Sequence, residues 1–285
     1  MLESKCENKV DYIMLKTLLN EVVEIVQKAK ALIKDSEIIV YEKESGVNIV
    51  TSSDIEVQRF LCQELKKLMP EAGLLCEEEN LQQITSEYIW VIDPIDGTMN
   101  YARGIQECAI SIGLVHEQTA ILGVVANIWK DEIFTAYMNG GARRNGELIK
   151  VSTADFAEGI LCTAMSLYKK ELAKVCSDII YEVYMQCNDV RRFGSCALEL
   201  CYLAAGQCDL YFEIRVFPWD CAAASVILKE AGGILSGFDE GVLTFTAPTL
   251  LVAANNYSNY KKLLNTIKKH IKGEVAESIS WIQNI

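Results

Sequence analysis

Two aspartates, Asp93 and Asp96, stand three residues apart at the end of an apolar stretch, within the segment WVIDPIDGTMNYARG. Carboxylate oxygens are the ligands that Mg²⁺ prefers in proteins. Two divalent ions roughly 3.5–4 Å apart, bridged by one carboxylate, form the clamp that many enzymes use for phosphoryl transfer. Proline, aspartate and glycine are also common turn residues. The spacing alone therefore leaves two hypotheses open, a metal site and a capped turn.

The residues that follow this pair have the right types to hold a phosphate. We expect a strand to end at Asp93, because Pro94 lacks the N–H group that continues a sheet ladder. We expect the next helix to begin at Thr98. The backbone amides of Gly97 and Thr98 would then face the same opening as the two aspartates. Amides at the positive start of a helix suit a phosphate group.

Glu77 opens a run of three glutamates directly after the predicted strand GLLC. That strand precedes the strand of Asp93, and strands adjacent in sequence often pair in a sheet. Glu77 is therefore a candidate to stand beside Asp93. The alternative, which the run of acids alone favours, is a solvated loop.

Two predicted helix starts carry further candidates. Asp220 stands before CAAASVILKEAGG, where an aspartate is favoured as an N-cap for its own sake. The alanines at 222–224 make the first turn small and predict a close approach to another element. Ser195, after Gly194, is either an ordinary N-cap or part of a loop that faces the substrate.

Glu213 is predicted to lean over the same site. The segment CDLYFEI predicts a strand, in which Tyr211 and Glu213 share one face because side chains alternate. Glu213 also lies only seven residues before Asp220. Glu213 is therefore a candidate to face the same site as Asp220. The alternative is an exposed acid at a strand end.

Composition excludes several other kinds of chemistry. The chain has 285 residues and a net charge of −12, which disfavours nucleic acid as the main partner. The only two histidines, His116 and His270, lie in a predicted turn and a lysine-rich helix, which argues against a Ser-His-Asp triad or a histidine-based zinc site. Eleven scattered cysteines without a C-x-x-C pair are typical of buried thiols in a reducing compartment.

The pattern of elements predicts two halves. Residues 1–150 predict two helices followed by a largely antiparallel sheet, an α+β half that carries Glu77 and DPIDGT. Residues 151–285 predict strands alternating with helices, an α/β half that carries WDCAA, with FPWD as a turn before the helix. No apolar run approaches the roughly 20 residues of a membrane span. The N-terminal residues also lack a signal-peptide pattern, so we expect a cytoplasmic protein.

Taken together, these segments resemble the inositol monophosphatase family, within the lithium-sensitive, Mg²⁺-dependent phosphatases. The resemblance rests on the glutamates at 77–78, on DPIDGT at 93–98 and on WDCAA at 219–223, in that order. It implies an α/β fold, a layered αβαβα sandwich of the sugar-phosphatase type. It also implies two to three Mg²⁺ ions per site, lithium sensitivity and a homodimer.

The resemblance implies a role for each candidate. Glu77, Asp93 and the Ile95 carbonyl are implied to hold one Mg²⁺, and Asp93, Asp96 and Asp220 a second, with a weaker third ion near Glu77. The implied catalytic residues, which position a metal-activated water for in-line attack on phosphorus, are Glu77, Thr98 and Asp96. The implied substrate contacts are Asp96, Gly97, Thr98, Gly194, Ser195, Cys196, Glu213 and Asp220. Lys43 and Asp54 are implied to lie in a mobile loop and a supporting Thr/Asp pair.

The reaction implied is hydrolysis of inositol monophosphate, a small phosphorylated polyol, to inositol and phosphate. Two other activities of the same superfamily stay open, fructose-1,6-bisphosphatase and 3′-phosphoadenosine-5′-phosphate phosphatase. A hypothesis from another class is a binding protein on a phosphatase scaffold that no longer catalyses. The sequence departs from the family pattern at Cys76 and Glu79, which flank the two glutamates, and the segment 272–285 has no counterpart in that pattern.

Overall fold

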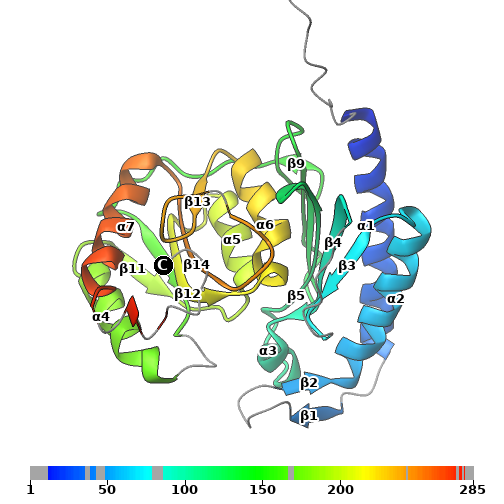
Figure 1. Ribbon diagram of the computed structural model, residues 1–285, viewed down its shortest axis with the longest axis horizontal. Helices are drawn as coiled ribbons and strands as arrows, with labels where there is room; N and C mark the ends of the chain where they lie inside the picture. Colours follow the sequence, from blue (N-terminus) through cyan, green and yellow to red (C-terminus); the bar gives the residue numbers. More distant parts are fainter. Residues whose placement is uncertain are drawn as a thin grey trace, which may run out of the picture.

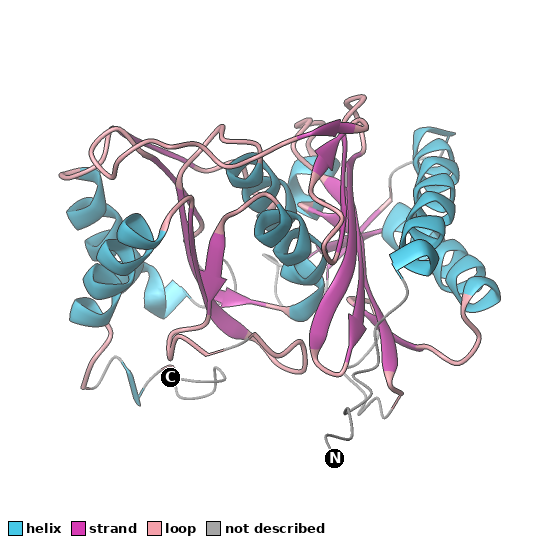
Figure 2. Cartoon of the chain, turned by 90° about the horizontal axis from the view of Figure 1, so that it is seen from above, coloured by secondary structure: helices cyan, strands magenta, loops and turns pink. Residues whose placement is uncertain are grey.

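The structure is a computed structural model and describes residues 12–35, 39–42, 49–78, 86–165, 170–241, 243–273, 276–277 and 279. The described elements stack in five layers, which Figures 1 and 2 show from two directions. The predicted α/β fold and its αβαβα layering are therefore confirmed. In order, the layers are helices α1 (Tyr12–Asp35) and α2 (Ser52–Leu68), a seven-stranded sheet, helices α5 (Cys196–Ala204) and α6 (Pro218–Glu230), a five-stranded sheet, and helices α4 (Ala173–Tyr184) and α7 (Tyr257–His270).

The seven-stranded sheet contains the strands predicted in the N-terminal half. Its first two strands pair, as expected from their order in the chain. They are parallel, whereas the other neighbouring strands are antiparallel. A two-residue turn joins β5 to β6, and both of its residues, Glu117 and Gln118, have positive φ, as such hairpin turns require. The strands in sheet order are β3 (Gly73–Cys76), β4 (Tyr88–Asp96), β5 (Ala109–His116), β6 (Thr119–Asn127), β7 (Ile133–Tyr137), β8 (Arg143–Arg144) and β9 (Glu147–Leu148).

The five-stranded sheet belongs to the C-terminal half and mixes parallel and antiparallel neighbours. One of its strands, β13, was not predicted. In sheet order the strands are β11 (Asp189–Arg191), β10 (Ile160–Thr163), β12 (Leu210–Val216), β14 (Thr249–Ala254) and β13 (Ile234–Ser236). The remaining elements are the hairpin of β1 (Val40–Glu42) and β2 (Ile49–Thr51), the short helix α3 (Thr98–Ala102) and the 3₁₀ turn η1 (Lys170–Leu172).

Helix α6 lies unusually close to the seven-stranded sheet. A β-carbon added to Gly123 of β6 would come within 2.2 Å of the Ala223 carbonyl oxygen, and one added to Gly113 of β5 within 3.0 Å of the Ala223 nitrogen. The small residues at 222–224 are therefore explained by this contact, as their size predicted. The Ser111 hydroxyl of β5 also donates to the Trp219 carbonyl at 3.3 Å. The first turn of α6 is thus fixed against β5.

Two local predictions were wrong. Strand β4 does not end at Asp93 but continues through Pro94 to Asp96, with a register irregularity between the two aspartates. FPWD is not a turn but the start of α6, so Asp220 is the third residue of the helix and Phe217 is its N-cap. Proline is favourable at the first helical position because its missing N–H has no partner there anyway.

Three clusters of buried apolar side chains fill the spaces between the five layers. Among the described helices, none has both the length and the apolar character needed to cross a membrane. The division of the chain near residue 150 stays a prediction.

Candidate active site

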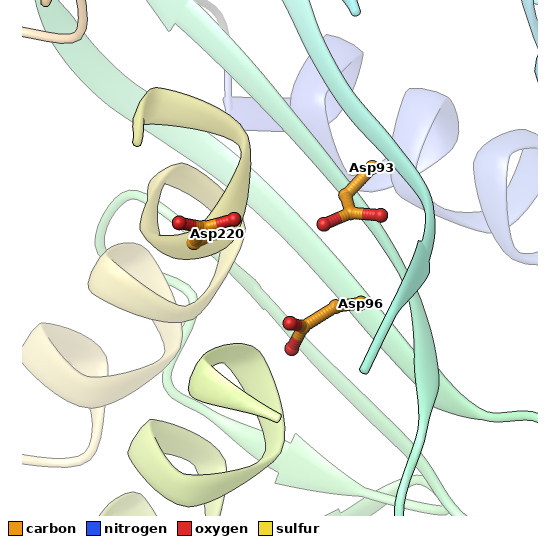
Figure 3. Close-up of side chains that lie close together, drawn as sticks. All are labelled: Asp93, Asp96 and Asp220. Carbon is orange, nitrogen blue, oxygen red and sulfur yellow. The ribbon is translucent and has the colours of Figure 1, made fainter. Parts of the chain in front are cut away.

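Three aspartates from two layers converge on one point. Asp93 and Asp96 come from β4, Asp220 comes from α6, and their side chains point toward one another (Figure 3). Each offers a carboxylate oxygen, and the three oxygens lie within 4.8 Å of one another. The long-range packing of α6 on the sheet is what brings Asp220 to the other two.

The irregularity in β4 explains why Asp93 and Asp96 share a face. Residues three apart on a regular strand point to opposite faces. Here Asp93 is opposite Ser111 and Asp96 is opposite Ala109, so three steps on β4 match two steps on β5. One extra residue is accommodated, as in a β-bulge, and a proline is tolerated at such a position. Pro94 therefore does not end the strand but helps turn both carboxylates to one side.

Backbone and hydroxyl donors orient each carboxylate. Asp93 Oδ1 accepts from the Ile95 N–H at 2.9 Å, and Asp220 Oδ2 accepts from the Phe217 N–H at 2.8 Å. Asp96 Oδ2 accepts from the Ser195 hydroxyl and from the Ala197 N–H at 2.8 Å. Each of these bonds uses a single oxygen of the carboxylate concerned.

The cluster disfavours three negative charges. Burial raises the pKa of Asp93 well above its usual range, and Glu77, Asp96 and Asp220 add to the rise. Burial also raises the pKa of Asp220 well above its usual range, with Asp96 and Glu77 contributing next. For Asp96, burial raises the pKa to about 6, while the Ser195 hydroxyl and the Ala197 N–H oppose the rise. Like charges in a low-dielectric site have this effect unless a cation compensates.

Glu77 lies beside the three aspartates without belonging to their tightest group. It lines the same cavity of about 110 Å³ and directly follows β3. Its N–H donates to the Ile92 carbonyl at 3.2 Å, one residue before Asp93. Its charge is the largest charge contribution to the raised pKa of Asp93. The parallel pairing of β3 with β4 therefore places Glu77 beside Asp93, as the strand order predicted.

Thr98 and Asp54 lie at the other end of the DPIDGT stretch. The Thr98 hydroxyl lies 3.0 Å from the Ile95 carbonyl oxygen, to which it donates, and 3.4 Å from Asp54 Oδ1. Asp54 is fully buried and accepts from the Thr51 N–H at 2.8 Å and from its hydroxyl. Gly97 precedes α3 with φ at +88°, in the region that favours glycine. Lys43 lies outside the described residues.

The start of α5 contributes a second side of the site. Ser195 is the N-cap of α5, and its hydroxyl oxygen accepts from the Leu198 N–H. The same hydroxyl donates to Asp96, so Ser195 both caps the helix and faces the site. Gly194 and Cys196 line the same cavity. The two hypotheses for Ser195, an N-cap and a residue of a loop that faces the site, are therefore compatible, because one hydroxyl makes both contacts.

Glu213 also lines this cavity, from β12. The Tyr211 hydroxyl donates to Glu213 Oε2 at 2.7 Å, in agreement with the prediction that the two share a face. Burial raises the pKa of Glu213 to about 7, the bond from Tyr211 lowers it, Asp96 raises it and Arg192 lowers it. The charges of Asp96 and Arg192 therefore act on Glu213 in opposite directions.

Glu199 is a site residue that we did not predict. It is 1% exposed, lines the cavity from α5, and its Oε1 accepts from the Phe193 and Gly194 N–H groups at 2.6 and 2.9 Å. It thereby holds the loop that carries Gly194. The signal was present in the sequence, since Glu199 is the only charged residue in the otherwise apolar helix CALELCYLA.

We expect Glu199→Gln to flatten the pH dependence of stability. Burial raises the pKa of Glu199 from 4.5 to about 8, against the effect of the two N–H donors. Between these values the folded state holds a proton that the unfolded chain has lost, so stability falls as pH rises. Glutamine keeps the acceptor and removes the titration. Relative to wild type, the variant should gain up to about 1.4 kcal/mol per pH unit in that window.

The measurement is urea unfolding of both proteins at several pH values from 5 to 8, at a fixed saturating Mg²⁺ concentration. Glu199→Ala is the matched control, because it removes the acceptor as well as the charge and should be destabilised across the whole range. Parallel curves for wild type and Glu199→Gln would show that Glu199 does not titrate in this window.

A larger cavity, of about 300 Å³, lies elsewhere and contains none of the three aspartates. Two of its charged side chains, Lys130 and Glu107, pair with each other. The Lys130 ammonium contacts one oxygen of Glu107, and the Tyr202 hydroxyl donates to the other at 2.6 Å. The size of a cavity therefore does not by itself identify the candidate active site.

The profile of the inositol monophosphatase family matches residues 8–272. The chain belongs to this family. It is 35% identical over 230 residues to Nus factor SuhB of Escherichia coli (strain K12), which covers 79% of this chain and 86% of that protein. It is 34% identical over 247 residues to inositol monophosphatase 3 of Solanum lycopersicum, covering 84% and 91%. The solved inositol monophosphatase from Anabaena (Nostoc) sp. PCC 7120 matches with a TM-score of 0.77 at 29% identity, covering 90% of this chain and 97% of that one.

Membership in the inositol monophosphatase family supports a phosphatase, and the family as a whole depends on Mg²⁺. The donor set of this member fits such an ion. Asp93, Asp96 and Asp220 offer only hard oxygen ligands within 4.8 Å of one another. Burial raises the pKa of each, neighbouring carboxylates add to the rise, and a divalent cation would relieve that repulsion. The acidic cluster of this inositol monophosphatase family member could therefore bind a metal.

Proposed function

We propose that this protein is a Mg²⁺-dependent phosphomonoesterase that hydrolyses inositol monophosphate to inositol and phosphate. The observation that carries the proposal is the convergence of Asp93, Asp96 and Asp220 in a cavity that Glu213 also lines. The named relative from Solanum lycopersicum supports this substrate, because its name is inositol monophosphatase 3. The deciding test is release of phosphate from inositol-1-phosphate in the presence of Mg²⁺.

In this proposal the chain's own groups divide the work. Asp93, Asp96 and Asp220, with Glu77 and the Ile95 carbonyl, would hold two to three Mg²⁺ ions. Bound Mg²⁺ supplies charge neutralisation of the phosphate and a lowered pKa for a coordinated water. The Thr98 hydroxyl, 3.0 Å from the Ile95 carbonyl, and Glu77 would orient the attacking water. The loop at 194–196, in which the Ser195 hydroxyl donates to Asp96, would contact the substrate from the α5 side of the site.

We expect Glu213→Ala to lower kcat/KM for inositol-1-phosphate by about ten- to a hundredfold. A hydrogen bond from a substrate hydroxyl to a charged group contributes roughly 1.5–3 kcal/mol. Glu213 lines the same cavity as the aspartates, where ring hydroxyls would meet its oxygens. The measurement is steady-state kinetics on inositol-1-phosphate and on p-nitrophenyl phosphate, which has no such hydroxyls and should lose far less.

Glu213→Gln is the matched control, since it keeps an acceptor at the same place and should lose less than the alanine variant on inositol-1-phosphate. Equal losses on both substrates would mean that Glu213 supports the fold or the metals. The inositol assignment would then lose its main residue-level support.

A second candidate function, hydrolysis of a doubly phosphorylated substrate, is favoured by two arginines that line the cavity. Arg192 and Arg215 line the same cavity as Glu213, and the Arg215 guanidinium lies 4.7 Å from the centre of the Phe217 ring. A polyol monophosphate offers these cations no anion beyond the phosphate that the metals would hold. A substrate with a second phosphate, such as fructose-1,6-bisphosphate or 3′-phosphoadenosine 5′-phosphate, offers one. A panel of the three substrates, with Arg215→Ala, separates the candidates: selective loss on the doubly phosphorylated substrates supports the second.

The name of the Escherichia coli relative, Nus factor, raises a role apart from catalysis. A binding protein on a phosphatase scaffold would bind without releasing phosphate, so the phosphate-release assay also decides this alternative. The net charge of −12 argues against nucleic acid as the main partner. The proposal includes a homodimer, which the mass in solution tests directly.

A further inference from the structure

Two cysteines meet beside the candidate metal site. Cys62 lies on α2, and Cys76 is the last residue of β3, directly before Glu77. Their Sγ atoms are 3.4 Å apart. A disulfide requires a separation of about 2.05 Å, so the two sulfurs would have to approach by only roughly 1.4 Å. Cys76 is also one of the residues at which the sequence departs from the family pattern.

The two thiols differ in access. Cys62 is half-buried, whereas Cys76 is 2% exposed. A reagent from solvent would therefore meet Cys62 first, with Cys76 behind it within reach of the sulfur. Of the other cysteines that the structure describes, only Cys187 is also half-buried. It lies in the connection between α4 and β11, and Figure 1 shows these two elements at the opposite end of the molecule from α2 and β3. A half-buried thiol in contact with a second thiol is therefore found at one place in the described part of the chain.

We propose that Cys62 and Cys76 form a reversible redox modification site, which takes small-molecule disulfides such as oxidised glutathione. In the first step Cys62 loses its proton, and its sulfur attacks one sulfur of the oxidant. A mixed disulfide forms and one glutathione leaves as a thiol. In the second step Cys76 loses its proton and attacks the Cys62 sulfur, and the second glutathione leaves. The protein loses two protons and two electrons, and the oxidant gains them as it becomes two thiols.

The position of Cys76 couples this site to the acidic cluster. Cys76 is opposite Ile92 in the parallel ladder of β3 and β4, and the next residue, Glu77, donates its N–H to the Ile92 carbonyl at 3.2 Å. The same segment also contacts α2, because the Gln58 side chain of that helix accepts from the Glu78 N–H at 3.0 Å. Drawing Cys76 toward α2 would therefore move Glu77 relative to Asp93. This coupling rests on the proposed function, whereas formation of the disulfide does not.

The experiment begins with the full chain in glutathione buffers of increasing oxidised fraction. We expect an intact mass lower by two hydrogens and a peptide map in which Cys62 is linked to Cys76. Cys62→Ser and Cys76→Ser should abolish that link, and Cys187→Ser, the half-buried control, should leave it unchanged. A wild-type protein that stays fully reduced at Cys62 and Cys76, while the buffer oxidises Cys187 to its glutathione adduct, would overturn the proposal.

The second arm measures Mg²⁺ binding by thermal shift, which needs no substrate. We expect the disulfide to raise the Mg²⁺ concentration at half-maximal stabilisation about tenfold, in the range that loss of a supporting group around a metal produces. Dithiothreitol should restore the original value, and oxidant should not change it in Cys62→Ser. An oxidised wild-type protein with an unchanged Mg²⁺ midpoint would overturn the coupling. Failure of the reduced protein to hydrolyse any phosphate ester would instead overturn the proposed function, and the peptide map would still decide the redox site.

Discussion

Asp220→Asn is expected to lower kcat by a hundredfold or more while the protein stays folded. Asparagine can still accept from the Phe217 N–H, which Asp220 now does at 2.8 Å, so the start of α6 keeps its bond. What is lost is one of the three converging charges. Loss of even a supporting group around a metal costs about 10- to 100-fold, and a direct ligand should cost more. The measurement is kcat at saturating substrate and Mg²⁺, with circular dichroism to confirm folding.

Asp209→Asn is the matched control for this substitution. Asp209 is also buried, and it accepts from the Ile160 N–H at 2.8 Å and from the Ser152 hydroxyl, away from the cluster. Its loss should lower stability with little change in kcat. In contrast, metal-free Asp220→Asn should melt higher than metal-free wild type, because burial and repulsion raise the pKa of Asp220 in the wild-type protein. A folded Asp220→Asn protein with near-normal kcat would leave Asp220 with a structural role only.

The second large effect is expected from removal of metal. EDTA should abolish phosphate release, and Mg²⁺ should raise the melting temperature, because it binds the folded cluster and not the unfolded chain. At a hundred times the dissociation constant this stabilisation is about 2.7 kcal/mol, which corresponds to about 5 °C for a chain of this size. Differential scanning fluorimetry with and without Mg²⁺ measures the shift, and a phosphate assay measures activity.

Asp93→Asn is the control for the melting shift, since Asp93 carries the largest number of repelling neighbours in the cluster. The variant should lose most of the Mg²⁺-dependent stabilisation and should melt higher than wild type without metal. Full activity in EDTA would exclude the proposed mechanism. Lithium in the millimolar range should inhibit wild type by competing for one metal position, an expectation that rests on the family resemblance alone.

The layers of the fold and most members of the aspartate cluster could be predicted from the sequence. The reason differs from residue to residue. Asp93 and Asp96 could be recognised because their spacing and the adjoining glycine are local. The bulge that turns them to one face could not, because it depends on the register with Ser111 and Ala109 in another strand. Pro94 predicts a strand end, because a proline has no N–H to donate to the sheet ladder. It is tolerated inside a strand where a bulge removes the need for that N–H.

The C-terminal contributions to the site were harder to predict for a related reason. The sequence predicts Asp220 at the N-cap, but the helix begins at Pro218, two residues before Asp220, which makes Asp220 its third residue. Glu199 was overlooked because the pattern of α5 is otherwise that of a core helix. Its partners are the N–H groups of Phe193 and Gly194, which only the folded loop presents to it. The places of Asp220 and Glu199 in the site therefore depend on tertiary contacts, which local sequence patterns do not reveal.

The contact between α6 and the glycines of β5 and β6 has a consequence for the order of folding. Asp93 and Asp96 belong to a sheet that can form from residues synthesised early, whereas Asp220 arrives only when α6 has settled against Gly113 and Gly123. The aspartate cluster is therefore completed by one of the longest-range contacts among the described residues, which loop-closure entropy makes slow to form. In refolding experiments, Mg²⁺ should leave the early phases unchanged and slow unfolding instead. Tight metal binding would then begin only when the five layers are assembled, so that a nascent or partly folded chain does not hold the ion.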